Sequence, residues 1–183
     1  MKKLLITIML SLSSLAYGNS LQSANPRHLV RVGWGDMLFE SMAFPSAGRD
    51  RGGKGYTGHL FAEYQYRLTR VVSVGAQLDF QGIYRAEMND YDLTFLPTVR
   101  FTYLRTRMVQ MYSGVGAGLL FAFDNQGGRE FAPALNLNFA GVQLGEGPLT
   151  IGFELGLLNA LTSPHNIYMA GARLVSLSLN YQF

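Results

Sequence analysis

The chain has 183 residues, of which 48% are hydrophobic, 13% aromatic and only 15% charged, with 21 glycines and no cysteine. The low charge and the many aromatic residues exclude a disordered chain, and the lack of cysteine excludes a disulfide scaffold and any Cys-based zinc or redox site. Two of the three net positive charges come from Lys2 and Lys3, so a nucleic-acid-binding surface is not indicated. The length fits one domain.

The first 18 residues have the pattern of a cleavable export signal. Residues 1–3 are Met-Lys-Lys, residues 4–10 form an apolar core, and Ala16-Tyr17-Gly18 fits a small-x-small cleavage site. The apolar core is too short to span a bilayer, and no later segment offers about 18 consecutive apolar residues. We therefore expect a signal peptide at 1–18, a mature domain at 19–183, and no membrane-spanning helix.

The mature sequence is dominated by a two-residue alternation of apolar and polar side chains, which is typical of β-strands. In the last segment, for example, Leu177, Leu179 and Tyr181 alternate with Ser178 and Asn180. The pattern predicts eight strands, which in chain order are Val30–Trp34, Leu60–Leu68, Val72–Phe80, Tyr91–Tyr103, Val109–Phe123, Phe131–Phe139, Leu149–Leu157 and Arg173–Phe183.

The segments between these strands alternate between long and short. Residues 36–56, 85–90, 124–129 and 161–166 form the long connections, and short turns fall at 69–70, 105–107 and 145–148. Transmembrane β-barrels have short periplasmic turns and longer outer loops, so the alternation indicates such a barrel. The apolar stretch 37–44 either extends the first strand or folds over the barrel mouth, and the sequence does not decide between these.

A soluble lipocalin-like barrel would alternate in the same way but would face its apolar side chains inward. Aromatic residues near the strand ends of the apolar face favour a membrane barrel, because aromatic rings prefer the membrane interface. The predicted interface aromatics are Trp34, Tyr66, Phe80, Tyr91, Tyr103, Phe121, Phe123, Phe131, Phe139 and Tyr181.

The polar face is rich in small and amide side chains and carries spaced charges, as expected for a narrow lumen whose charges neutralise one another. The predicted lumen charge network is Arg31, Glu63, Arg67, Asp79, Asp92, Arg100 and Glu154. An eight-stranded interior is just wide enough for side chains to fill it. We therefore expect a sealed, polar lumen, and the fold class is all-β, an eight-stranded antiparallel up-and-down transmembrane β-barrel.

On these features the chain resembles small Gram-negative outer-membrane β-barrel proteins, of the OmpX type or the transmembrane domain of OmpA. The resemblance covers the mature chain and lies in its pattern rather than in a unique motif. It implies an outer-membrane location, with outer-membrane lipid, lipopolysaccharide and the assembly machinery as partners. The terminal residues Leu179, Tyr181 and Phe183 are similar to the signal that this machinery recognises. No peptidoglycan-binding domain is expected, and we expect a monomer.

Two groups of residues outside the lumen network are candidates for binding sites, one for lipopolysaccharide and one for a metal ion. The basic residues Arg49, Arg51 and Lys54 would contact lipopolysaccharide phosphates, because guanidinium groups bind phosphate well; the alternative is a solvated loop. The three histidines lie too far apart along the predicted barrel to share a metal ion, so we expect no metal and no cofactor.

The primary hypothesis is a structural or surface-interaction role through the outer loops, in envelope integrity or adhesion. Some proteins of this kind modify lipid A with a catalytic histidine, and His59 with Ser46 or Ser163 is the corresponding alternative. A narrow small-solute channel is the second alternative.

Overall fold

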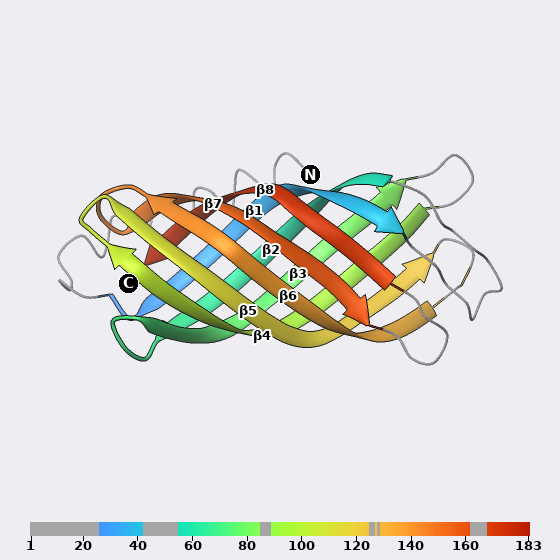
Figure 1. The fold of residues 1–183 in the computed structure, drawn as a ribbon, viewed down its shortest axis with the longest axis horizontal. Coiled ribbons are helices and arrows are strands. Elements are labelled where there is room, and N and C mark those ends of the chain that lie inside the picture. The colour runs from blue at the N-terminus through green and yellow to red at the C-terminus, as the bar shows by residue number, and fades with distance from the viewer. Residues whose placement is uncertain (1–25, 42–54, 85–88, 125–126, 128, 162–167) are drawn as a thin grey trace.

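The structure is a computed structural model, and it describes residues 26–41, 55–84, 89–124, 127, 129–161 and 168–183. In these residues eight antiparallel strands close into a single barrel, in which each strand pairs with its neighbours in sequence and the first pairs with the last (Figure 1). The strands are β1 (His28–Ser41), β2 (Gly55–Arg67), β3 (Val72–Tyr84), β4 (Asn89–Arg105), β5 (Val109–Asp124), β6 (Arg129–Leu144), β7 (Leu149–Leu161) and β8 (Tyr168–Gln182). The predicted all-β, up-and-down barrel is confirmed.

The apolar side chains face outward and the polar ones face the lumen. Along β4, Leu93, Phe95 and Phe101 are exposed, whereas Thr94 and Thr98 between them are buried. Large apolar side chains are exposed on all eight strands, and most of the buried side chains are polar or charged. A surface this apolar needs a lipid environment, so the lipocalin-like alternative does not fit. No helix in the described ranges is long and apolar enough to cross a membrane.

The strands run farther than the alternation predicted, mainly at the end of the barrel that carries the long connections. β1 continues to Ser41 and β3 to Tyr84, so the apolar stretch after residue 36 extends the first strand at least to Ser41. The connections that were expected to be long at 85–90 and 124–129 are consequently reduced to 85–88 and 125–128, as short as the turn at 68–71. A tilted strand of about 9–11 residues crosses a bilayer, so these strands of 13 to 17 residues project beyond it.

We call the two ends of the barrel the turn end and the loop end. The turn end carries the connections 68–71, 106–108 and 145–148 together with Arg27 and Phe183, and the loop end carries the other four connections. In Figure 1 the turn end is on the left, where the C-terminus is marked. The two ends therefore carry the connections that the sequence assigned to them, but only 42–54 and 162–167 at the loop end are longer than the turns.

The first and last strands meet at a seam that the end of the chain closes. His28 and Phe183 exchange two backbone hydrogen bonds, of 2.9 and 3.0 Å. Their rings stack with centroids 5.1 Å apart, and the Phe183 ring also stacks on Tyr181 at 5.6 Å. The His28 Nδ1 lies 2.8 Å from the Tyr64 hydroxyl. Tyr181 and Phe183, for which the assembly role stays a prediction, therefore contribute to closing the barrel.

Candidate functional site

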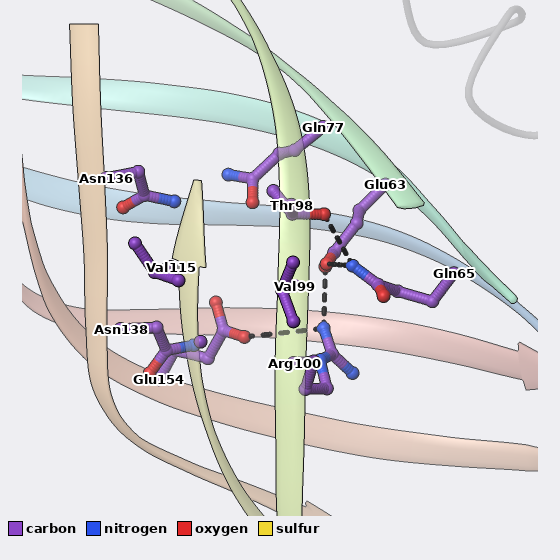
Figure 2. Close-up of a pocket in the computed structure, with 11 residues that line it drawn as sticks. Glu63, Gln65, Gln77, Thr98, Val99, Arg100, Val115, Asn136, Asn138 and Glu154 are labelled. Atoms are coloured by element: carbon purple, nitrogen blue, oxygen red, sulfur yellow. Dashed lines mark hydrogen bonds and ion pairs between the residues drawn. The ribbon is translucent and has the colours of Figure 1, made fainter. Parts of the chain in front are cut away.

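Four charged side chains meet in the middle of the lumen and form one ion-pair network. Arg31 contacts the carboxylates of both Glu63 and Glu154, the latter at 2.6 Å. Arg100 lies 2.7 Å from Glu63 and 3.9 Å from Glu154, as the dashed lines in Figure 2 show. All four residues are at most 6% exposed. Two arginines and two glutamates balance, so the network is electrically neutral where burial would make an unpaired charge costly.

Neutral side chains complete the hydrogen bonding of this network. Arg31 donates to Asn180 Oδ1 at 2.9 Å and to Ser178 Oγ at 3.2 Å. Gln65 donates to Glu63 at 2.5 Å and to Thr98 at 2.6 Å. The charges therefore lie within a shell of fixed dipoles, which is the condition under which a buried ion pair stabilises rather than destabilises a fold.

Tyr112 is a central member of the network that the sequence analysis did not identify. Its hydroxyl donates to Glu154 Oε1 at 2.8 Å, and the guanidinium carbon of Arg100 lies 4.0 Å from its ring centre. The ring occupies space that only a glycine leaves open, because a Cβ at Gly141 would lie 2.2 Å from a ring carbon. The alternation of the sequence could have identified it, because Tyr112 is two residues before Gly114 and therefore lies on the same lumen face of β5.

The other three predicted lumen charges lie toward the two ends of the barrel. Arg67 is the last residue of β2, at the turn end. Asp79 and Asp92 are fully buried nearer the loop end, where Gln77 donates to both carboxylate oxygens of Asp79 at 2.8 and 3.0 Å. The lumen thus contains a central cluster of four charges, with the other three predicted charges placed toward its two ends.

His59 lies inside the lumen toward the loop end and is 1% exposed. Its Nε2 lies 3.7 Å from Asp79 Oδ1, and its ring stacks on Phe61 with centroids 5.5 Å apart. Gly35 lets it approach Ser176, because a Cβ at Gly35 would lie 2.5 Å from Ser176 Oγ and 2.8 Å from His59 Cε1. Ser176 was not predicted as its neighbour, and the predicted partners Ser46 and Ser163 lie outside the described residues.

Two small cavities that the described residues line lie on either side of Arg100 in the packed lumen. One is shown in Figure 2 and is lined by Glu63, Gln65, Arg100 and Glu154 among others, and the second opens at the turn end. Each has a volume of about 10 Å³, which is room for about one water molecule. Gln65 and Arg100 line both cavities, so the side chains of the network separate them.

The predicted interface aromatics have the outward parity of their strands, and all but one of them are exposed or partly exposed. Trp34, Phe80, Tyr103, Phe121, Phe123, Phe131 and Phe139 are all exposed, and Tyr66 and Tyr91 are partly exposed. Tyr181 is only 6% exposed, because it packs within the seam cluster described above. At the loop end Tyr91 stacks between Phe80 and Phe123, with ring centroids 6.2 and 5.5 Å away.

The predicted signal peptide and the predicted lipopolysaccharide contact fall on residues that the structure does not describe. Residues 1–18 and the basic residues Arg49, Arg51 and Lys54 lie outside the described ranges, so the signal peptide and the lipopolysaccharide contact stay predictions. Within the described ranges, no three His, Asp or Glu side chains lie close enough together to hold a metal ion.

No protein-family model and no curated protein sequence matches this chain. Among solved structures, Neisserial surface protein A (NspA) is similar with a TM-score of 0.60 and 14% identity, covering 85% of this chain and 97% of that one. The outer membrane enzyme PagL is similar with a TM-score of 0.53 and 12% identity, covering 85% and 99% of the two chains. At these identities the likeness shows the fold, which is that of the eight-stranded outer-membrane β-barrels.

Proposed function

We propose that this chain is an integral outer-membrane protein whose sealed barrel carries a surface-interaction role at its loop end. The apolar outer face supports membrane insertion, and both structural neighbours named above are outer-membrane or surface proteins. Because bacterial barrels keep their short turns in the periplasm, the loop end would face the outside. One neighbour is called a surface protein and the other an enzyme, so the fold alone does not assign the role.

The observation that carries this proposal is the packed lumen. The ion-pair network of Arg31, Glu63, Arg100 and Glu154 crosses the barrel between two cavities that each hold about one water molecule. A solute would have to displace these paired charges, which is costly in a buried site. A function that depends on passage of a solute through the lumen is therefore disfavoured. The surface at the loop end is then the part of the barrel that would bind a specific partner.

The basic residues Arg49, Arg51 and Lys54 are the proposed contact with lipopolysaccharide phosphates. The segment that contains them joins β1 to β2 at the loop end. It therefore leaves the barrel on the side where the outer leaflet would lie. Each basic side chain near an anionic surface contributes about 1 kcal/mol at physiological salt.

We expect the triple variant Arg49→Gln, Arg51→Gln, Lys54→Gln to bind lipopolysaccharide at least about tenfold more weakly than the unaltered barrel. The measurement is calorimetric titration of the purified barrel, in uncharged detergent, with lipopolysaccharide at two salt concentrations. Arg70→Gln is the matched control, because Arg70 is an exposed arginine in the 68–71 turn at the opposite end. Equal binding by both variants would remove the proposed contact.

The lipid A-modifying alternative finds little support in the position of His59. The histidine is buried in the lumen, whereas lipid A lies outside the barrel wall and would need a catalytic group on the outer face. We therefore expect the mass spectrum of lipid A to be the same in cells that express the barrel, its His59→Ala variant, or neither. A modification that appears with the barrel and is lost in His59→Ala would make the protein an enzyme instead.

A further inference from the structure

The lumen opens at the turn end into a mouth that three arginines surround. Arg27, Arg67 and Arg105 line this opening, and Arg100 and Tyr112 lie deeper in the same cavity. We call the opening bounded by Arg27, Arg67 and Arg105 the basic mouth. Its lining, among the residues that the structure describes, contains hydroxyls and amides but no carboxylate. Three positive charges therefore converge on a small polar cavity.

Backbone geometry places each arginine at this opening. Arg67 is the last residue of β2 and has the lumen parity of the buried Gln65, two residues earlier. Its backbone N–H donates to the carbonyl of Arg27 at 2.8 Å. Arg105 depends on a β-bulge, a shift in the register of β4 against β5 between Thr102 and Leu104. Strict alternation would give Arg105 the outward parity of Tyr103, but the bulge re-aims it inward, which is a common effect of bulges near functional sites.

The arginines are held near one another although their charges are alike. The guanidinium of Arg105 donates from Nη2 to Gln110 Oε1 at 3.1 Å, and Gln110 also lines the basic mouth. The charges of Arg67 and Arg105 repel each other, and Arg67 is half-buried. Holding like charges together costs free energy, and an anion bound between them would recover it.

The two glutamates of the central network do not line the basic mouth. Glu63 pairs with Arg31 and Arg100, and Glu154 pairs with Arg31 and accepts a hydrogen bond from Tyr112. This central network is neutral by itself, so its two glutamates do not compensate the arginines of the basic mouth. The hydroxyls of Ser73 and Thr102, which also line the opening, are further donors for an oxygen ligand.

We propose that the basic mouth binds an oxyanion, a phosphate or carboxylate group, at its open rim at the turn end, where Arg27 and Arg105 are exposed. Arginine presents several N–H donors in a planar fork and binds both kinds of group with two parallel hydrogen bonds. In the orientation proposed above this site faces the periplasm. That assignment of compartment rests on the proposed function, whereas binding at the site does not. The anion is either a free solute or the phosphate of a phospholipid headgroup in the adjacent leaflet.

The test is a titration of the folded, isotopically labelled barrel with inorganic phosphate in uncharged maltoside micelles, followed by NMR of the arginine side-chain N–H groups. We expect saturable shifts of the Arg67 and Arg105 signals. Arg105→Gln and Arg67→Gln should each weaken phosphate binding by about tenfold. A heat-dependent gel shift confirms that each variant is folded, so loss of binding is separated from loss of the barrel.

Arg107→Gln is the matched control. Arg107 is an exposed arginine at the same end that pairs with Glu146 in the neighbouring turn and does not line the basic mouth. Its loss should leave phosphate binding unchanged. Shifts that do not saturate, that chloride reproduces at equal ionic strength, or that Arg107→Gln weakens as much as Arg105→Gln would each overturn the proposal, because they indicate general charge screening.

A second arm identifies the source of the anion. The barrel is placed in nanodiscs that contain phosphatidylglycerol or only phosphatidylcholine, and the phosphate titration is repeated. If phosphatidylglycerol abolishes the phosphate-dependent shifts, the site takes a lipid headgroup. If phosphate binds equally in both, the site takes a soluble anion. Since neither arm involves residues 42–54, failure here and failure of the proposed loop contact are distinguishable.

Discussion

Replacing Glu63 by glutamine should lower the free energy of unfolding by about 3–5 kcal/mol, the usual cost of breaking a buried ion pair by removing one partner. Glutamine keeps the size of the side chain and can still accept hydrogen bonds from Arg31 and Arg100. It cannot balance their charge, and Glu154 alone then faces two buried guanidinium groups. The effect is electrostatic because the shape of the lumen is preserved.

The measurement is urea-induced unfolding in lipid vesicles, followed by the fluorescence of Trp34, which is the single tryptophan and is 53% exposed on the outer face. Glu146→Gln is the control, because it removes an exposed ion pair with Arg107 at the turn end. An exposed pair contributes at most about 1 kcal/mol. Similar losses in the two variants would show that the central network does not hold the barrel together.

A double variant separates loss of charge balance from loss of packing. In Glu63→Gln with Arg100→Met, one positive and one negative charge are removed, and Arg31 and Glu154 remain as a balanced pair at 2.6 Å. We expect the double variant to be more stable than the sum of the two single losses implies, because the two sites are coupled. Additive losses would assign the effect of Glu63 to packing alone.

The wall of the barrel was predictable from the sequence because it depends on a local property. Along residues 91–103 the alternation assigns each side chain to the correct face, and exposed Phe95 and buried Thr94 follow it. The rule fails where the backbone contains a bulge. Arg105 follows the bulge at Tyr103 in β4, and the register of β8 against β7 shifts between Arg173 and Ser176. Beyond each of these points, strict alternation assigns side chains to the wrong face.

The lumen network was predictable in composition but not in pairing. Arg31 on β1 contacts Glu154 on β7, a strand to which β1 is not hydrogen-bonded. Such a contact crosses the interior and depends on the tilt and stagger of the whole barrel, which no local pattern encodes. The same reason explains why the contact of Tyr112 with Glu154 was missed, although parity places Tyr112 on the lumen face.

The second large effect is expected on the outer face, where Phe95→Arg should destabilise the barrel by about 2–4 kcal/mol in a bilayer. Phe95 is 49% exposed and lies within the span of β4, away from both strand ends. An arginine there would place its charge in hydrocarbon if the outer face contacts lipid. In water an exposed arginine would cost little, so the size of the loss reports the surroundings of the barrel.

Tyr103→Arg, on the same strand, provides a control for depth. Tyr103 is 57% exposed and lies two residues from the end of β4, where an arginine can extend its charge to the interface, and the expected cost is about 0–1 kcal/mol. Unfolding in vesicles, again followed by Trp34 fluorescence, compares the two variants. Because both replace an exposed aromatic ring by arginine, a difference between them measures the depth of the side chain in the membrane. Equal and small losses would mean that the outer face does not lie in lipid, and the outer-membrane placement would be wrong.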